Sequence, residues 1–156
     1  MRGITQDKKI LSSYFEKMKK HEWTCFSPNC DKKCINSHVL QKNGILTQIA
    51  LDKHLIEVKP TNIWEIDNQS VFKYQKIGIN EAFTFPGFCS LHDSEIFKNI
   101  ESAIVDFSSY KTQCLFSYRG LCQEIRRKQQ IELFLNNILS NRDRFSTCLL
   151  YTSTKP

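Results

Sequence analysis

Two closely spaced pairs of residues in this chain have the types and the spacing that bind zinc. Cys25 and Cys30 flank four residues that include a Pro-Asn dipeptide, and Cys89 and His92 flank two. Zn²⁺ takes thiolate sulfur and imidazole nitrogen in tetrahedral geometry, and a pair on a tight turn supplies half of the tetrahedron. The spacing therefore predicts one structural zinc ion held by three cysteines and one histidine.

His38 is the alternative source of the fourth ligand, because it follows the first pair closely. If His92 serves only to cap the helix expected behind it, the imidazole of His38 completes the same donor set. The two pairs are complete without His38. We therefore assign the zinc to the two pairs and leave His38 for another role.

The other cysteines are better explained as core residues than as disulfides. The chain has seven cysteines, an odd number, and it begins without the pattern of an export signal. Thiols stay reduced in the cytosol, where a free cysteine packs as a small apolar side chain. We therefore expect Cys34, Cys114 and Cys122 to be buried. Simple burial is also the competing explanation for the cysteines of the two pairs.

The order of these residues resembles that of HNH-type nucleases. In that family a pair of zinc ligands precedes a strand ending in the general-base histidine, and a second pair opens a helix that carries another metal ligand. The resemblance implies that His38 activates water and that Asp93 helps to hold a second divalent ion. This chain has Ser37 where the family has an acidic residue, and Asn80 is the candidate for the middle asparagine.

Longer stretches resemble a family of uncharacterised bacterial proteins with the zinc-binding pattern C…C…SHxxQ…GFCxxHDxxIF…YRxL. The matching residues lie within 25–125, at 36–41, 85–93, 96–101 and 116–121. The resemblance implies the same zinc-site residues and no particular activity. Within the pattern, Glu101 and Arg119 either pair, which ties the zinc-binding segment to a long helix, or remain two solvated charges.

Charge and composition limit the choice of partners. The 156 residues carry a formal net charge of +6 and are 40% hydrophobic and 24% charged. A positive chain suits a partner with phosphate groups, and the candidate contacts are Lys32, Lys33, Arg126 and Arg127. The same side chains also fit an ordinary solvated surface. Nucleic acid is therefore one predicted partner, and a protein bound through the C-terminal helix is the other.

The apolar stretches are only a few residues long, well short of the roughly 20 residues that cross a bilayer. Lysines rather than an apolar segment follow the N-terminal residues, so we expect no secretory signal, no membrane partner and a cytoplasmic protein. The helical pattern stops at residue 145. We expect 145–156 to be a non-native tail and the natural protein to be longer.

Hydrophobic periodicity predicts the elements that position these residues. Apolar positions spaced by three and four predict a helix over 6–20 and a weaker one over 39–50. Runs of β-forming residues separated by turn residues occupy 54–58, 62–66 and 71–76. A small antiparallel sheet is therefore expected in the middle of the chain.

Two further helices are expected in the C-terminal half. The first begins behind the second zinc-binding pair, is capped by Asp93 or Ser94, and turns Ile104 toward the core. The second covers 110–140 and buries an apolar stripe that includes Leu121.

The predicted fold class is α+β: a treble-clef-like zinc unit with a small antiparallel hairpin sheet, flanked by an N-terminal helix and a long C-terminal helix. The corresponding segments are 1–22 for the first helix, 23–106 for the zinc unit and 107–144 for the last helix. We expect that last helix to be the start of a longer helical region.

Two functions from different classes follow from these patterns. The first is a zinc-stabilised nucleic-acid-associated domain with an HNH-like layout, of which a nuclease is the catalytic form. The second is a non-catalytic structural zinc module that presents a helical surface to a protein. Hydrolysis at a catalytic zinc is disfavoured, because four protein ligands close the coordination shell.

Overall fold

The computed structural model describes residues 2–60, 72–101 and 104–145. These residues contain an N-terminal helix, two small antiparallel sheets and a long C-terminal helix, so the expected α+β class is confirmed. In the part of the chain that is described, no helix is both long and apolar enough to span a membrane.

The chain divides into two compact units. The larger unit is Glu22–Arg126, and the smaller unit combines Met1–His21 with Arg127–Pro156. Helix α4 (Tyr110–Leu139) is continuous and supplies residues to both. Both of the predicted zinc-binding pairs belong to the larger unit.

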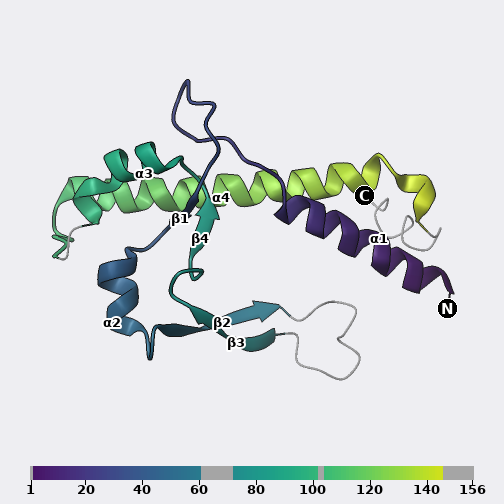
Figure 1. The fold of residues 1–156 in the computed structure, drawn as a ribbon, viewed down its shortest axis with the longest axis horizontal. Helices are drawn as coiled ribbons and strands as arrows, with labels where there is room; N and C mark the ends of the chain where they lie inside the picture. The colour runs from purple at the N-terminus through teal and green to yellow at the C-terminus, as the bar shows by residue number, and fades with distance from the viewer. Residues whose placement is uncertain (1, 61–71, 102–103, 146–156) are drawn as a thin grey trace. The chain divides into compact units, whose positions relative to one another are not determined.

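The first sheet of the larger unit joins two short strands from distant parts of the sequence. β1 (Asn36–His38) pairs antiparallel with β4 (Thr84–Pro86), with Ser37 opposite Phe85. β1 follows the first predicted zinc-binding pair, and β4 leads to the second pair at the start of α3 (Figure 1). The pairing of these strands therefore brings the two halves of the predicted site toward each other.

The second sheet is a hairpin. β2 (His54–Pro60) and β3 (Phe72–Gly78) pair antiparallel over seven residues each. They correspond to the strands expected over 54–58 and 71–76. The run expected over 62–66 lies outside the described residues.

The helix expected over 39–50 is replaced by a shorter, irregular element. A π-helical turn covers Lys42–Leu46 and a single α-helical turn, α2, covers Thr47–Ile49. The π turn is closed by the N–H of Leu46, which donates to the carbonyl of Gln41 at 3.0 Å. A Cβ on Gly44 would lie 2.0 Å from Gln41 Oε1, so a larger residue here would have to displace the buried Gln41 side chain, although glycine disfavours a regular helix.

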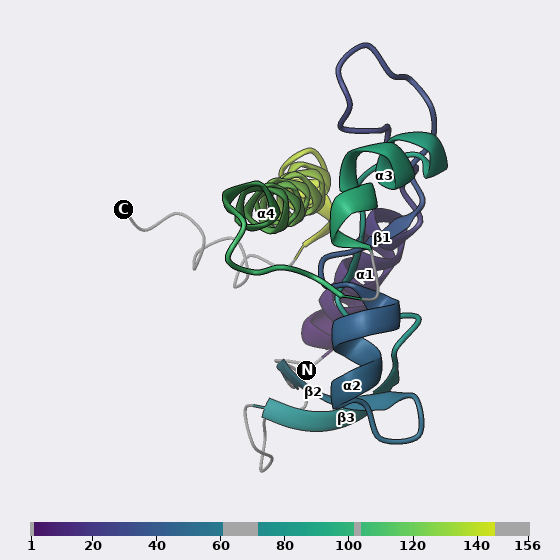
Figure 2. The same cartoon turned by 90° about the vertical axis from the view of Figure 1, so that its left-hand side faces the viewer.

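Aromatic rings beside α3 (Ser90–Phe97) form the core of the larger unit. Phe88, Phe97 and Ile100 are fully buried. The ring of Phe88 lies 5.1 Å from that of Phe97, which in turn stacks 6.1 Å from Tyr118 of α4. α3 accordingly lies beside α4, as Figure 2 shows.

Some apolar residues of the C-terminal half are less buried than their spacing predicts. Ile104 is 90% exposed, because the helical segment ends with a 3-10 turn at Lys98–Ile100. On α4, Cys122 is buried as expected, whereas Cys114 and Leu121 are exposed. Spacing alone did not identify the side of the long helix that faces the core, because apolar residues occur on two of its faces.

The smaller unit packs helix α1 (Arg2–Lys19) against residues from the C-terminal part of the chain. Ile10 and Tyr14 are buried together with Phe145, and the rings of Tyr14 and Phe145 lie 6.2 Å apart. Phe145 is the first residue of the segment expected to be a non-native tail, and it is part of this core. The remaining residues, 146–156, lie outside the described part of the chain.

Candidate metal centre

The side chains of both predicted pairs meet in one cluster. One ligand atom from each of Cys25, Cys30, Cys89 and His92 lies within 4.8 Å of the other three. His92 Nδ1 is 3.4 Å from Cys25 Sγ and 3.4 Å from Cys89 Sγ. The sulfurs of Cys30 and Cys89 are 3.9 Å apart.

These distances agree with the geometry of a tetrahedral metal site. Ordinary zinc bond lengths place two sulfur ligands roughly 3.8 Å apart, and a sulfur and a nitrogen ligand roughly 3.6 Å apart. Three sulfurs and one nitrogen are a donor set that favours zinc, whereas calcium and magnesium prefer oxygen ligands. The cluster could therefore hold a metal ion such as zinc.

The first half of the cluster is a tight loop closed by backbone contacts. Thr24 and Lys33 form an antiparallel bridge, and the N–H of Cys25 donates to the carbonyl of Lys32 at 2.9 Å. Inside the loop, Asn29 has a positive φ of 58°, a conformation that asparagine tolerates better than most residues. The loop therefore presents its two cysteines on the same side as a consequence of local sequence.

The second half of the cluster is the start of α3. Cys89 is the N-cap of this helix, with an extended backbone, and the helix begins at Ser90 rather than behind Asp93 or Ser94 as expected. The carbonyl of Cys89 accepts from the N–H of Asp93 at 2.9 Å. This start places His92 in the first turn, where its ring reaches the sulfur of Cys89. Capping propensity alone placed the helix start too late.

Backbone N–H groups connect the two halves through the sulfur of Cys25. Cys25 Sγ accepts from the N–H of Ser27 at 3.4 Å and from the N–H of Cys89 at 3.2 Å. The second bond joins residues that are 64 positions apart in the sequence. Donors directed at sulfur stabilise a thiolate, the form that binds a metal.

The thiols of the cluster differ in acidity. The backbone N–H of His92 lowers the pKa of Cys89 below its ordinary value. The pKa of Cys30 is raised: the backbone N–H of Lys32 favours its thiolate, but burial and the neighbouring thiols of Cys25 and Cys89 outweigh that contact. Several thiolates this close together repel one another, and a divalent cation relieves that repulsion.

Cys34 lies near the cluster and is not one of its four members. Its Sγ donates to the carbonyl of Gly87 at 3.2 Å. Burial raises the pKa of Cys34 to about 11, which keeps the thiol protonated and able to donate. Burial also raises the pKa of Cys122. The partly buried Cys34 and the buried Cys122 thus fit the packing role expected for them, unlike the exposed Cys114.

His38 lies apart from the four-residue cluster, on strand β1. Its Nε2 is 2.9 Å from the carbonyl oxygen of Ile79. Asp93, the other predicted catalytic residue, is in the first turn of α3 with both carboxylate oxygens 3.4–3.5 Å from Arg119 Nη2. Their catalytic roles stay predictions.

Arg119 of α4 ties that helix to the segment that carries the second half of the cluster. Its side chain is 1% exposed, and its Nη1 donates to Glu101 Oε1 at 2.6 Å, so of the two alternatives left open the ion pair is the one that is present. The guanidinium also lies 4.2 Å from the centre of the Phe97 ring. A charge with so little exposure needs such partners, because water does not reach it.

Arg126 ties α4 to the loop that carries the first half of the cluster. It is 3% exposed, and its Nη2 donates to the carbonyl of Thr24 at 2.8 Å, while its guanidinium lies over the rings of Trp23 and Phe26. Burial lowers the pKa of Arg126, and the nearby cysteines offset part of that effect. The expectation that Arg126 contacts phosphate is wrong, because its guanidinium is enclosed by the protein.

This role of Arg126 was not predicted, although the sequence contains a signal for it. Arg119, Cys122 and Arg126 are spaced by three and four residues, which places them on one face of α4. Because Cys122 was expected to be buried, the arginines on its face should have been expected there too. The other three candidate phosphate contacts, Lys32, Lys33 and Arg127, are exposed, and Lys33 pairs with Glu22.

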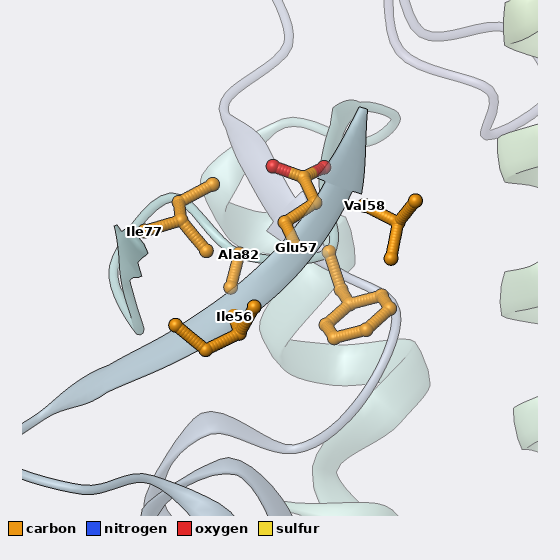
Figure 3. A pocket seen from close by; sticks show the side chains of 6 residues that line it. Ile56, Glu57, Val58, Ile77 and Ala82 are labelled. Atoms are coloured by element: carbon orange, nitrogen blue, oxygen red, sulfur yellow. The ribbon is translucent and has the colours of Figure 1, made fainter. Parts of the chain in front are cut away.

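A pocket of about 290 Å³ lies on the β2–β3 sheet, lined by Ile56, Glu57, Val58, Ile77, Ala82 and Phe83. Figure 3 shows these side chains around strand β2. Neither His38 nor Asp93 lines the pocket, and Glu57 is the one titratable side chain among the six lining residues. The two predicted catalytic residues therefore lie outside the lining of this pocket.

Comparison with models of known protein families, with curated proteins and with solved structures finds no match to this chain. The resemblances to a bacterial zinc-binding family and to HNH nucleases stay predictions. The interpretation of the site therefore depends on its own geometry.

Proposed function

We propose that this protein is a structural zinc module in which Cys25, Cys30, Cys89 and His92 hold one Zn²⁺ ion. The observation that carries the proposal is the convergence of all four ligand atoms within 4.8 Å. A full set of four protein ligands is typical of structural zinc sites, whereas catalytic sites keep one position for water or substrate. The ion would join a loop and a helix that are far apart in the sequence.

The order of elements around the cluster supports a treble-clef-like arrangement. A loop with the first two ligands is followed by β1 and its partner β4, and then by α3 with the other two ligands. The β2–β3 hairpin is an insertion between β1 and β4. The buried Arg119 and Arg126 hold α4 against the two segments that carry the cluster, the first loop and α3. We propose that zinc stabilises these two segments, which we call the zinc platform, and thereby the surface on which α4 lies.

The HNH-like nuclease is the second candidate function. The observation that favours it is the sequence of β1, β4 and α3, with His38 on the first strand and Asp93 on the helix. The contacts of both side chains with the protein favour the structural function instead: His38 with Ile79 and Asp93 with the buried Arg119. Cleavage of DNA or RNA that needs a divalent ion and is lost in His38→Ala would establish the nuclease.

Zinc content in a matched pair of histidine variants tests the structural function. We expect about one zinc per chain in the wild type, because the described residues provide one four-ligand cluster. His92→Ala is expected to lose most of the metal. His38→Ala, the control, is expected to keep it and to melt close to the wild type. Folded protein without metal, or metal lost only in His38→Ala, would contradict the assignment.

A further inference from the structure

The exposed face of α4 carries a regular apolar pattern that the metal site does not use. Positions spaced alternately by three and four residues run along it, which is the heptad spacing of a helix that packs against another helix. From the first position to the last, they are Cys114, Tyr118, Leu121, Ile125, Lys128, Glu132, Leu135 and Leu139; of these, Tyr118 also stacks its ring on Phe97 of the core. We call this set the α4 seam.

The apolar members of the α4 seam are open to solvent. Leu121 is 58% exposed, Ile125 42%, Leu135 48% and Leu139 50%. They lie on a different side of α4 from the buried Arg119, Cys122 and Arg126. All seam residues belong to one continuous helix, so the pattern follows from helix geometry alone. A row of large exposed apolar side chains of this kind marks an interaction surface.

When two copies of the α4 seam are aligned in opposite directions, each seam residue from Leu121 to Leu139 faces a residue of complementary type. If two copies of α4 run antiparallel about a two-fold axis beside Gln130, Leu121 faces Leu139 and Ile125 faces Leu135 of the other copy. Lys128 then faces Glu132 twice, once on each side of the axis. Every apolar residue of this overlap meets an apolar residue, and each charge meets its opposite.

A parallel pairing is disfavoured by the same residues. In a parallel pair each seam position faces its own copy, so Lys128 would face Lys128 and Glu132 would face Glu132. Like charges facing each other at a contact are destabilising and act against that arrangement. We propose that the α4 seam is a docking surface for a second copy of this chain in antiparallel orientation.

The proposal deepens the proposed function, because it names the partner of the helix that the zinc platform holds. The isologous contact is closed by its two-fold axis, so it yields a dimer and not an open chain. The overlap of about 19 residues spans roughly 28 Å of helix.

Charge exchange at the centre of the seam tests the proposal. Sedimentation equilibrium of zinc-containing wild type is expected to show a monomer–dimer equilibrium. Lys128→Glu and Glu132→Lys should each weaken the dimer by roughly tenfold or more, since like charges then face each other. The double variant K128E/E132K restores opposite charges and should recover wild-type association. Lys111→Glu, an equal charge change on α4 outside the overlap, should leave the equilibrium unchanged.

The native Cys114 provides a test of orientation. A parallel pair brings Cys114 opposite its own copy, whereas the antiparallel pair separates the two sulfurs by roughly 50 Å. In a Cys148→Ser background, mild oxidation should therefore yield no Cys114–Cys114 disulfide. Finding that disulfide, finding a monomer at every concentration, or finding no effect of the single charge changes would overturn the proposal.

Zinc content separates failure of this proposal from failure of the proposed function. Seam variants should keep the wild-type zinc content, because no seam residue is among the four cluster ligands. A monomeric protein with one zinc per chain would overturn the dimer alone. A zinc-free protein that still dimerises would overturn the zinc function alone.

Discussion

The cysteine–histidine cluster and the β2–β3 hairpin lie in the same unit but differ in what stabilises them: buried side chains and long-range contacts around the cluster, and backbone hydrogen bonds in the hairpin. Around the cluster, Phe88 and Phe97 are fully buried, and one N–H···S bond joins residues 64 positions apart. In the hairpin, Ile56 is 67% and Tyr74 79% exposed, and the backbone ladder supplies the regular contacts.

This difference shows where the stability of the larger unit resides. An isolated two-stranded hairpin is marginally stable in water, so the hairpin depends on the remainder of the unit more than it supports it. The cluster joins segments that would otherwise be far apart, and a metal ion bound there adds its binding free energy to folding. Substitutions around the cluster should therefore lower the free energy of unfolding more than substitutions in the hairpin.

The largest effect is expected from removal of one cluster sulfur. Cys25→Ser should abolish the cooperative unfolding transition of the larger unit, because structural zinc contributes on the order of 10 kcal/mol in small domains. Thermal unfolding and zinc content measure the two consequences together. Cys122→Ser is the matched control: its buried polar group should cost about 1–3 kcal/mol while zinc is kept. Equal effects of the two variants would remove the distinction between ligand and core cysteine.

A smaller loss of stability is expected from replacing Arg119, which joins α4 to the zinc platform. Arg119→Met keeps the bulk of the side chain and leaves the carboxylates of Asp93 and Glu101 without their partner. Both carboxylates are partly exposed and can rehydrate, so the expected loss is roughly 1–3 kcal/mol, below that of a fully buried pair. Chemical denaturation measures it. Lys111→Met, on the exposed side of α4, should change stability by less than about 0.5 kcal/mol.

Backbone packing beside the cluster gives an effect of similar or smaller size. A Cβ at Gly87 would lie 2.5 Å from the ring of Phe85, so Gly87→Ala should destabilise by about 1–3 kcal/mol through overpacking. At Gly120, on α4, nothing lies within 4 Å, and Gly120→Ala should stabilise by about 0.5–1 kcal/mol through helix propensity. Melting temperatures that shift in the same direction for both variants would contradict the packing described at Gly87.

The smallest effect is expected in the hairpin. Tyr74→Ser removes a ring that is 79% exposed and should change the free energy of unfolding by no more than about 0.5 kcal/mol. The same denaturation experiment measures it. A loss near that of Arg119→Met would show that the hairpin contributes as much as the contacts around the cluster.

The candidate site was accessible from the sequence because its signals are local. Cys25 and Cys30 flank a turn, and Cys89 and His92 are three positions apart, so each half is defined by a few neighbouring residues. The choice between His92 and His38 depends on tertiary structure, since both follow a cysteine closely. The position of His38 on β1, facing the carbonyl of Ile79, decides which histidine joins the cluster.

Several features that were not predicted from the sequence depend on contacts between residues far apart in the chain. β4 has three residues, too few for periodicity to reveal, and it exists because β1 pairs with it. α3 starts at Ser90 despite the capping preference of Asp93, and the N–H of its N-cap residue, Cys89, donates to the sulfur of Cys25, 64 positions away. The burial of Arg126 depends on the carbonyl and aromatic rings that the first loop brings to α4.

The most direct test of the central claim is X-ray absorption at the zinc edge of the purified protein. Zinc held by Cys25, Cys30, Cys89 and His92 should give three sulfur ligands at about 2.3 Å and one nitrogen ligand at about 2.0 Å. In His92→Ala that nitrogen should be lost, or the metal with it. A wild-type spectrum dominated by oxygen ligands, or one with four sulfurs, would contradict the proposed centre.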